Sequence, residues 1–164
     1  MIEAIVFDLD NTLVYLPIDY ENLFQGFGKI MKTEDVRPLT KTIPKLDEET
    51  KKKIFEVWEK AELEAFKKIR ENKNGMVVYR KFCEQSKALI TLQGRTVTDA
   101  ILKFTGLSFN AVVTREDSFD RIEQLEIALQ KLDVKPSNVL FVGDSEGDIS
   151  SARAVGCHFL KVVK

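Results

Sequence analysis

Cysteine is scarce in this sequence of 164 residues, which contains only Cys83 and Cys157. Two distant cysteines do not make a disulfide framework, so we expect reduced thiols and a cytoplasmic protein. No apolar run approaches the roughly 20 residues that cross a bilayer. The N-terminus shows neither a charged leader nor a cleavage site. We therefore expect no association with a membrane.

An excess of charge of either sign is also missing. The chain has 25 basic and 26 acidic residues, and its formal net charge is −1. This balance argues against a nucleic-acid-binding surface, because such surfaces carry a clear excess of lysine and arginine. We therefore expect no nucleic-acid partner.

Apolar residues, in contrast, make up 44% of the chain, which is enough for a core. The length predicts one domain, with room for a small insertion. Short apolar runs predict strands at residues 2–7, 87–93, 110–114, 138–143 and 157–163. Helical patterns lie at residues 75–86, 95–106, 120–134 and 146–156. This alternation predicts an α/β fold of three layers with a doubly wound parallel sheet.

Residues 17–73 interrupt the alternation, because they contain two predicted helices, at 19–32 and 47–72, and no long strand. An insertion of this size is too large for a simple crossover between strands. We predict a small helical cap that lies over the sheet edge where the first strand ends. The predicted boundaries are 1–16 and 75–164 for the α/β core and 17–74 for the cap insertion.

Acidic residues follow two of the predicted strands. Asp8 and Asp10 follow "AIVF", and Asp144 and Asp148 lie in "GDSEGD" after "NVLFV". Parallel strands place such residues at one edge of the sheet, where ligands bind. Two carboxylates about 4 Å apart repel by on the order of 4 kcal/mol at an effective dielectric near 20. The cluster should therefore take up protons or bind a hard cation, and oxygen ligands favour Mg²⁺. The alternative, that each aspartate only caps a loop or helix, explains one such motif better than two.

The motifs "FDLDNTL" and "GDSEGD" resemble those of the haloacid dehalogenase superfamily, in particular its phosphoglycolate-phosphatase-like members. The resemblance covers essentially the whole chain, because the strand–helix alternation and the helical insertion after the first motif also fit. It implies a Rossmann-like sheet of order 5-4-1-2-3 with an inserted helical cap. It also implies Mg²⁺-dependent phosphohydrolase activity.

The resemblance gives the aspartates their roles. Asp8 would be the nucleophile that forms an aspartyl-phosphate. Asp10 would protonate the leaving group and later activate water. Mg²⁺ would be held by Asp8, the Asp10 backbone carbonyl and Asp144, with support from Asp148. An acid at position 10 points to a phosphatase or phosphomutase, because dehalogenases release a halide that needs no proton and lack an acid there.

The other family motifs are less complete here. Thr91 stands where the family has a hydroxyl residue that binds the phosphoryl group. Gly94 and Arg95 either contact an anionic substrate or form a turn that leads into a helix. No Lys-Pro opens the helix before "GDSEGD", so Arg121 is the first candidate for the family's cation and Arg115 the second. A surface position is the alternative for Arg121.

Together these features favour a Mg²⁺-dependent phosphatase that hydrolyses a small phosphorylated metabolite. A sugar phosphomutase of β-phosphoglucomutase type would use the same aspartates. A non-catalytic relative that binds a metal or phosphate would explain the incomplete third motif. The sequence leaves the identity of the substrate and the oligomeric state open.

Overall fold

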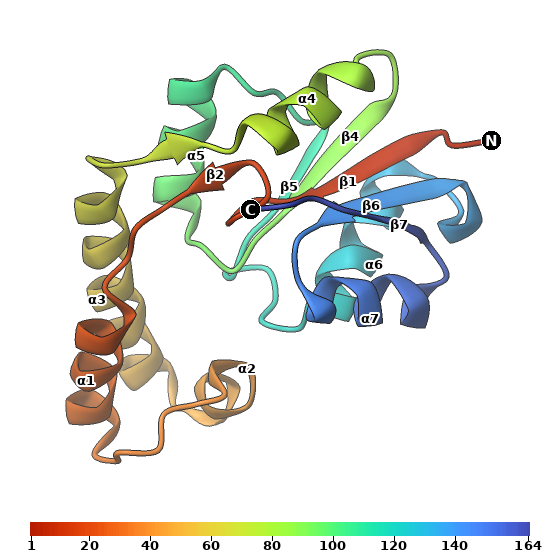
Figure 1. Ribbon diagram of the computed structural model, residues 1–164. Coiled ribbons are helices and arrows are strands. Elements are labelled where there is room, and N and C mark those ends of the chain that lie inside the picture. The colour runs from red at the N-terminus through yellow and green to blue at the C-terminus, as the bar shows by residue number, and fades with distance from the viewer.

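A five-stranded parallel sheet forms the centre of the protein, as the computed structural model of residues 1–164 describes it (Figure 1). Its strands are β1 (Ala4–Asp8), β4 (Ser86–Ile90), β5 (Ala111–Val113), β6 (Val139–Gly143) and β7 (His158–Lys161). They lie in the order β5-β4-β1-β6-β7, and every neighbouring pair is parallel. This confirms the predicted α/β class and its parallel sheet. The central position of β1 places Asp8 between two neighbouring strands.

Side chains that alternate along β1 divide the core into two layers. Ile5 and Phe7 belong to one cluster, with residues of α4 (Lys73–Lys81) and α5 (Arg95–Thr105). Ala4 and Val6 belong to a second cluster, with residues of α6 (Arg121–Leu132) and α7 (Glu146–Val155). All four β1 side chains are fully buried. Burying a large apolar side chain contributes about 1.5–3 kcal/mol, so burial on both faces fixes the register of this strand.

Helices also fill residues 20–66, between the strands β1 and β4. They are α1 (Tyr20–Met31), α2 (Leu39–Thr42), the 3₁₀ helix η1 (Ile43–Lys45) and α3 (Glu48–Phe66). Helices α1 and α3 pack together through aromatic residues, and the Phe27 and Trp58 rings meet edge to face at 5.5 Å. In Figure 1 the three α-helices extend to one side of the sheet. We call residues 17–69 the helical segment.

A short ribbon connects the helical segment to the sheet. Strand β2 (Val14–Tyr15) pairs antiparallel with β3 (Arg70–Glu71). This ribbon ends α3 at Phe66, although the sequence predicts a helix through residue 72. The residues from 67 to 72 are compatible with a helix, and the tertiary pairing with β2 overrides that preference.

A second 3₁₀ helix, η2 (Pro136–Asn138), leads into β6. None of the helices combines the length and the apolarity that crossing a bilayer requires.

Candidate active site

Three aspartates meet at the carboxyl edge of the sheet. Asp8 ends β1, Asp144 follows β6, and Asp148 lies in the first turn of α7. One carboxylate oxygen from each lies within 4.8 Å of the others. Asp8 and Asp148 are 3% and 1% exposed, so water screens their charges poorly. Two segments far apart in the sequence thus form one acidic cluster.

The two carboxylate oxygens of Asp148 have different roles: one caps helix α7, and the other faces the acidic cluster. Its Oδ2 atom accepts hydrogen bonds from the Asp144 and Ser145 backbone amides, each at 3.3 Å, and completes a capping box with Ser145. A Cβ atom on Gly143 would lie 2.5 Å from this oxygen, so glycine is needed at that position. Helix capping therefore explains the position of Oδ2, as the alternative reading of the aspartates proposes. The other oxygen, Oδ1, lies close to Arg121.

Arg121, at the start of α6, is the cation of this cluster. Its Nη2 atom lies 2.5 Å from Asp8 Oδ1, and its Nε atom lies 3.2 Å from Asp148 Oδ1. Gln124, one turn later on α6, accepts a hydrogen bond from Arg121 Nη1 at 3.1 Å. Gln124 is fully buried and donates to the Thr91 backbone carbonyl, so the guanidinium is held from a rigid position.

Thr12 links the two acidic segments. Its hydroxyl lies within hydrogen-bonding distance of Asp8 Oδ2 at 3.0 Å and of Asp144 Oδ1 at 3.2 Å. The side chain is fully buried. The sequence analysis gives Thr12 no role, although its position two residues after Asp10 in the "DxDxT" motif is a usable signal.

Asp10 lies beside the cluster and has its own set of partners. Gln93 Nε2 donates to Asp10 Oδ1 at 3.0 Å, and the Thr91 hydroxyl donates to Asp10 Oδ2 at 3.4 Å. The Gln93 backbone amide in turn donates to Thr91 Oγ1 at 3.0 Å. Thr91, predicted as a phosphate-binding residue, is thus brought to the site. Gln93 was not among the predicted site residues, and its only signal in the sequence is its place two residues after Thr91.

Burial dominates the electrostatics of both catalytic candidates. It raises the pKa of Asp8 well above 3.8, and the Asp148 and Asp10 charges add to this effect while Arg121 opposes it. Burial also raises the pKa of Asp10 to about 6, against the hydrogen bond from Gln93 and the charge of Arg121. A carboxyl group with this pKa can both give and take a proton near neutral pH.

The remaining predicted cations lie elsewhere. The Arg95 guanidinium donates to Asp117 Oδ2 at 2.8 Å and forms no hydrogen bond with the acidic cluster. Arg115 is buried in a bidentate pair with Glu62 of α3 and likewise does not reach Asp8. The Gly94 amide donates to Glu62 Oε2 at 2.9 Å. Carboxylates of the protein therefore bind the guanidinium groups of Arg95 and Arg115 and the amide of Gly94.

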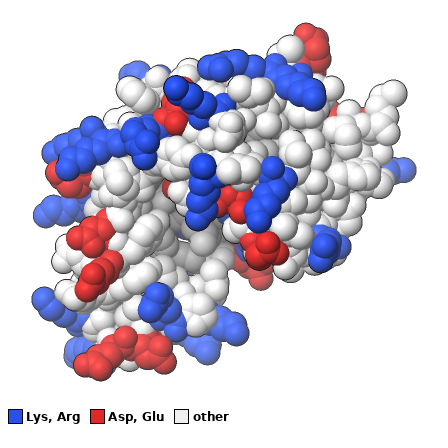
Figure 2. Space-filling model, in the orientation of Figure 1, with Lys and Arg blue, Asp and Glu red and all other residues white.

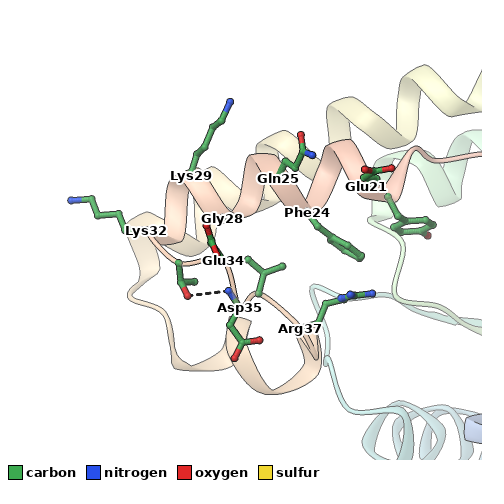
Figure 3. A pocket seen from close by; sticks show the side chains of 12 residues that line it. Glu21, Phe24, Gln25, Gly28, Lys29, Lys32, Glu34, Asp35 and Arg37 are labelled. Carbon is green, nitrogen blue, oxygen red and sulfur yellow. Dashed lines mark hydrogen bonds between the residues drawn. The ribbon is translucent and has the colours of Figure 1, made fainter.

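The helical segment contains a groove, one end of which approaches Gln93. It has a volume of about 940 Å³ and lies between α1 and residues 32–37. Tyr20 lines one end, and its hydroxyl oxygen lies 3.5 Å from Gln93 Nε2. Phe24 and Arg37 project toward each other, with the guanidinium carbon 5.5 Å from the ring centroid (Figure 3). Figure 2 shows the surface hollowed between the helical segment and the α/β part, with charges of both signs on the rim.

The donor set of the acidic cluster suits a small hard cation. Mg²⁺ binds six oxygens at about 2.1 Å, so opposite ligands lie about 4.2 Å apart. Neighbouring ligands lie about 3 Å apart, so the three carboxylate oxygens, within 4.8 Å of one another, would move closer together to share one ion. No sulfur or imidazole ligand belongs to the cluster. Four carboxylates against one guanidinium also leave an excess of negative charge that a divalent cation reduces.

Comparison with known proteins identifies the family of this chain. The sequence model of the haloacid dehalogenase-like hydrolase family matches residues 5–162, which include every residue of the site. The chain belongs to the haloacid dehalogenase-like hydrolase family. The resemblance inferred from the two aspartate motifs is thereby confirmed.

Relatives within this family are similar over most of their length. "Pyrophosphatase PpaX" of Oceanobacillus iheyensis is 26% identical over 178 residues, covering 93% of this chain and 79% of the relative. The haloacid dehalogenase-like protein SP0104 of Streptococcus pneumoniae has a TM-score of 0.71 at 18% identity, covering 98% of this chain and 84% of that one. CbbY of Rhodobacter sphaeroides, solved with phosphate, has a TM-score of 0.66 at 16% identity, covering 97% and 85%. At these identities the two solved structures support the fold.

Proposed function

We propose that the protein is a Mg²⁺-dependent phosphatase that hydrolyses a small phosphorylated metabolite through an aspartyl-phosphate. The observation that carries this proposal is the arrangement around Asp8. Its carboxylate lies in a cluster with Asp144 and Asp148, contacts Arg121, and has a second carboxyl group, Asp10, beside it.

Each residue of the site has a chemical task in this proposal. Asp8 attacks phosphorus and displaces the leaving oxygen, which takes its proton from Asp10. Asp10 then removes a proton from the water that hydrolyses the aspartyl-phosphate. Arg121 and the Thr91 hydroxyl stabilise the charge of the phosphoryl oxygens. Asp8, Asp144, Asp148 and the Asp10 backbone carbonyl would hold Mg²⁺, whose charge would offset the repulsion between these carboxylates and a phosphate dianion.

The helical segment acts as the cap and selects the leaving group. The groove along α1 begins at Tyr20. The Gln93 side-chain amide lies between Tyr20 and Asp10 and contacts both. Its lining contains three basic and three acidic side chains besides Phe24. A mixed lining of this kind suits a small polar leaving group. Arg37, which stacks on Phe24, is the residue we expect to contact it.

Inorganic pyrophosphate is the second candidate substrate, because a relative at 26% identity is named as a pyrophosphatase. The leaving group separates the two possibilities chemically. A phosphate leaving group needs less help from a proton donor than an alkoxide does. Asp10→Asn should therefore lower kcat/KM, which reports the step that expels the leaving group, far more for phosphomonoesters than for pyrophosphate.

The test is turnover of a panel of phosphorylated metabolites and pyrophosphate, measured as phosphate release with Mg²⁺ and with EDTA. We expect Mg²⁺-dependent release that Asp8→Asn abolishes. Formation of an isomeric sugar phosphate without phosphate release would instead identify a phosphomutase. If the whole panel is left intact while Mg²⁺ binds, the catalytic proposal is wrong and a binding role follows.

A further inference from the structure

Glu62 and Arg115 form a buried ion pair between the helical segment and the sheet. Glu62 lies on α3, and Arg115 lies two residues after the end of β5. Their side chains are 0% and 1% exposed. Arg115 Nη1 and Nη2 donate to the two Glu62 carboxylate oxygens at 2.6 and 2.8 Å. The Arg115 guanidinium carbon also lies 4.2 Å from the centroid of the Trp58 ring.

The pair holds the turn between Thr91 and Gly94. Arg115 Nη1 donates to the Leu92 carbonyl at 3.3 Å, and Glu62 Oε2 accepts from the Gly94 amide at 2.9 Å. The Arg115 backbone amide donates to the Gln93 carbonyl at 3.3 Å. A Cβ atom on Gly94 would lie 2.7 Å from Arg115 Nη2, so the turn lies directly on the ion pair. The peptide groups on both sides of Gln93 are thus tied to Glu62 and Arg115.

The fixed turn presents Gln93 to Asp10. The Gln93 side chain is 3% exposed, and its amide nitrogen lies 3.0 Å from Asp10 Oδ1. Thr91, at the other end of the turn, holds the second oxygen of the same carboxylate. Both hydrogen bonds from side chains to Asp10 therefore come from this turn.

We propose that Glu62 and Arg115 are positioning residues, which hold the Thr91–Gly94 turn so that Gln93 orients the Asp10 carboxylate. This inference deepens the proposed function, because it assumes that Asp10 transfers protons to and from substrate. It also makes the docking of α3 part of the catalytic geometry. A displacement of α3 would release Gln93 and, with it, Asp10.

A paired apolar replacement tests this role at a lower cost in stability than the removal of one partner, although it also removes the hydrogen bonds to Leu92 and Gly94. Replacing both partners of a buried ion pair by apolar residues is often neutral for folding, whereas removing one partner is costly. We expect Glu62→Leu/Arg115→Met to fold, to keep KM within about threefold, and to lose roughly 10- to 100-fold in kcat, as misplaced catalytic groups do. The matched control is Glu64→Leu/Lys67→Met, an exposed pair with a 2.9 Å contact at the end of the same helix. The control should leave kcat unchanged.

A double-mutant cycle with Gln93→Ala separates positioning from a general structural effect. If the pair acts through Gln93, its replacement should cost little further kcat once Gln93 is alanine. Independent, additive losses would overturn the proposal, and so would an unchanged kcat in the folded pair variant. If the pair variant does not fold, Glu62→Gln takes its place in the same cycle with the same two outcomes.

One readout does not need a substrate. The Gln93 side-chain amide resonance, followed by NMR in ¹⁵N-labelled protein, should move toward that of a solvent-exposed glutamine in the pair variant and stay in place in the control. No movement would overturn the inference about the turn. If the resonance moves but no substrate of the panel is hydrolysed, the positioning of Gln93 holds and only the proposed activity fails.

Discussion

Asp10 should make the metal-free protein more stable in mild acid than at neutral pH. Its pKa is raised from 3.8 to about 6 in the folded protein. The native state therefore binds more protons than the unfolded state between pH 4 and 6. The stability that protonated Asp10 contributes is fully present below pH 3.8, its ordinary pKa in the unfolded chain. It is lost as the pH rises through about 6, its pKa in the folded protein.

The magnitude follows from the size of the pKa shift. About two pKa units at about 1.4 kcal/mol each correspond to roughly 3 kcal/mol. For a chain of 164 residues this is a change in Tm of roughly 6–12 °C. Asp8, whose pKa is also raised, contributes in the same direction. Mg²⁺ at pH 7.5 should restore the lost stability, because a bound cation replaces the protons.

The assay is urea or thermal unfolding in EDTA at several pH values from 4.5 to 7.5, for the wild type and Asp10→Asn. The asparagine variant keeps an acceptor for Gln93 but cannot titrate. The difference in unfolding free energy between the two proteins cancels the contributions of the groups that do not interact with Asp10. Between pH 4.5 and 7.5 it should change by about 2 kcal/mol in favour of the variant, because the rest of the effect lies below pH 4.5. Parallel pH curves for the two proteins would refute the reasoning.

Substitutions at three further residues probe the cluster. Arg121→Met should lower the unfolding free energy of the EDTA-treated protein by about 3 kcal/mol, because Asp8 and Asp148 lose their shared cation. Arg121→Lys should recover only part of this stability, since one ammonium group cannot reproduce the two contacts. Thr12→Val should cost about 1–3 kcal/mol in urea unfolding by removing the donor between Asp8 and Asp144, and Thr12→Ser, which keeps the hydroxyl, should lose little. Asp8→Asn should raise the Tm in EDTA at pH 7.5 while weakening Mg²⁺ binding by calorimetry, because burial disfavours the charge that the variant lacks; a lower Tm contradicts this view.

The α/β fold was predictable because its signals are local. The residues of β1 are apolar without alternation, as burial on both faces requires, and the structure buries all of them. Helix ends were predictable where a side chain caps them. Asp47 accepts from the Thr50 amide at 2.7 Å at the start of α3. The other end of α3 was not predictable, because the pairing of β2 with β3 joins residues more than 50 positions apart.

The acidic part of the site could also be predicted from local pattern. A carboxylate at the end of a buried strand is costly wherever it occurs, so Asp8 and Asp144 attract attention without any knowledge of their neighbours. Arg121 carries a weaker signal of the same kind. A cation in the first turn of a helix opposes the helix dipole, and its contacts with Asp8 and Asp148 supply the compensation.

The roles of the other arginines depend on partners that spacing does not reveal. The sequence offered Arg115 as the second candidate for the family's cation and Arg95 as a contact for an anionic substrate or part of a turn. Their actual partners are carboxylates, and Glu62, the partner of Arg115, is 53 positions away on α3. In the sequence, Glu62 is one of many glutamates on a charged helix. Only the full burial of its side chain distinguishes it from exposed neighbours such as Glu64. A buried charge keeps its ionised form only with a dedicated partner. Glu62, which forms this pair between the helical segment and the sheet, therefore couples the position of the helical segment to the geometry of the site.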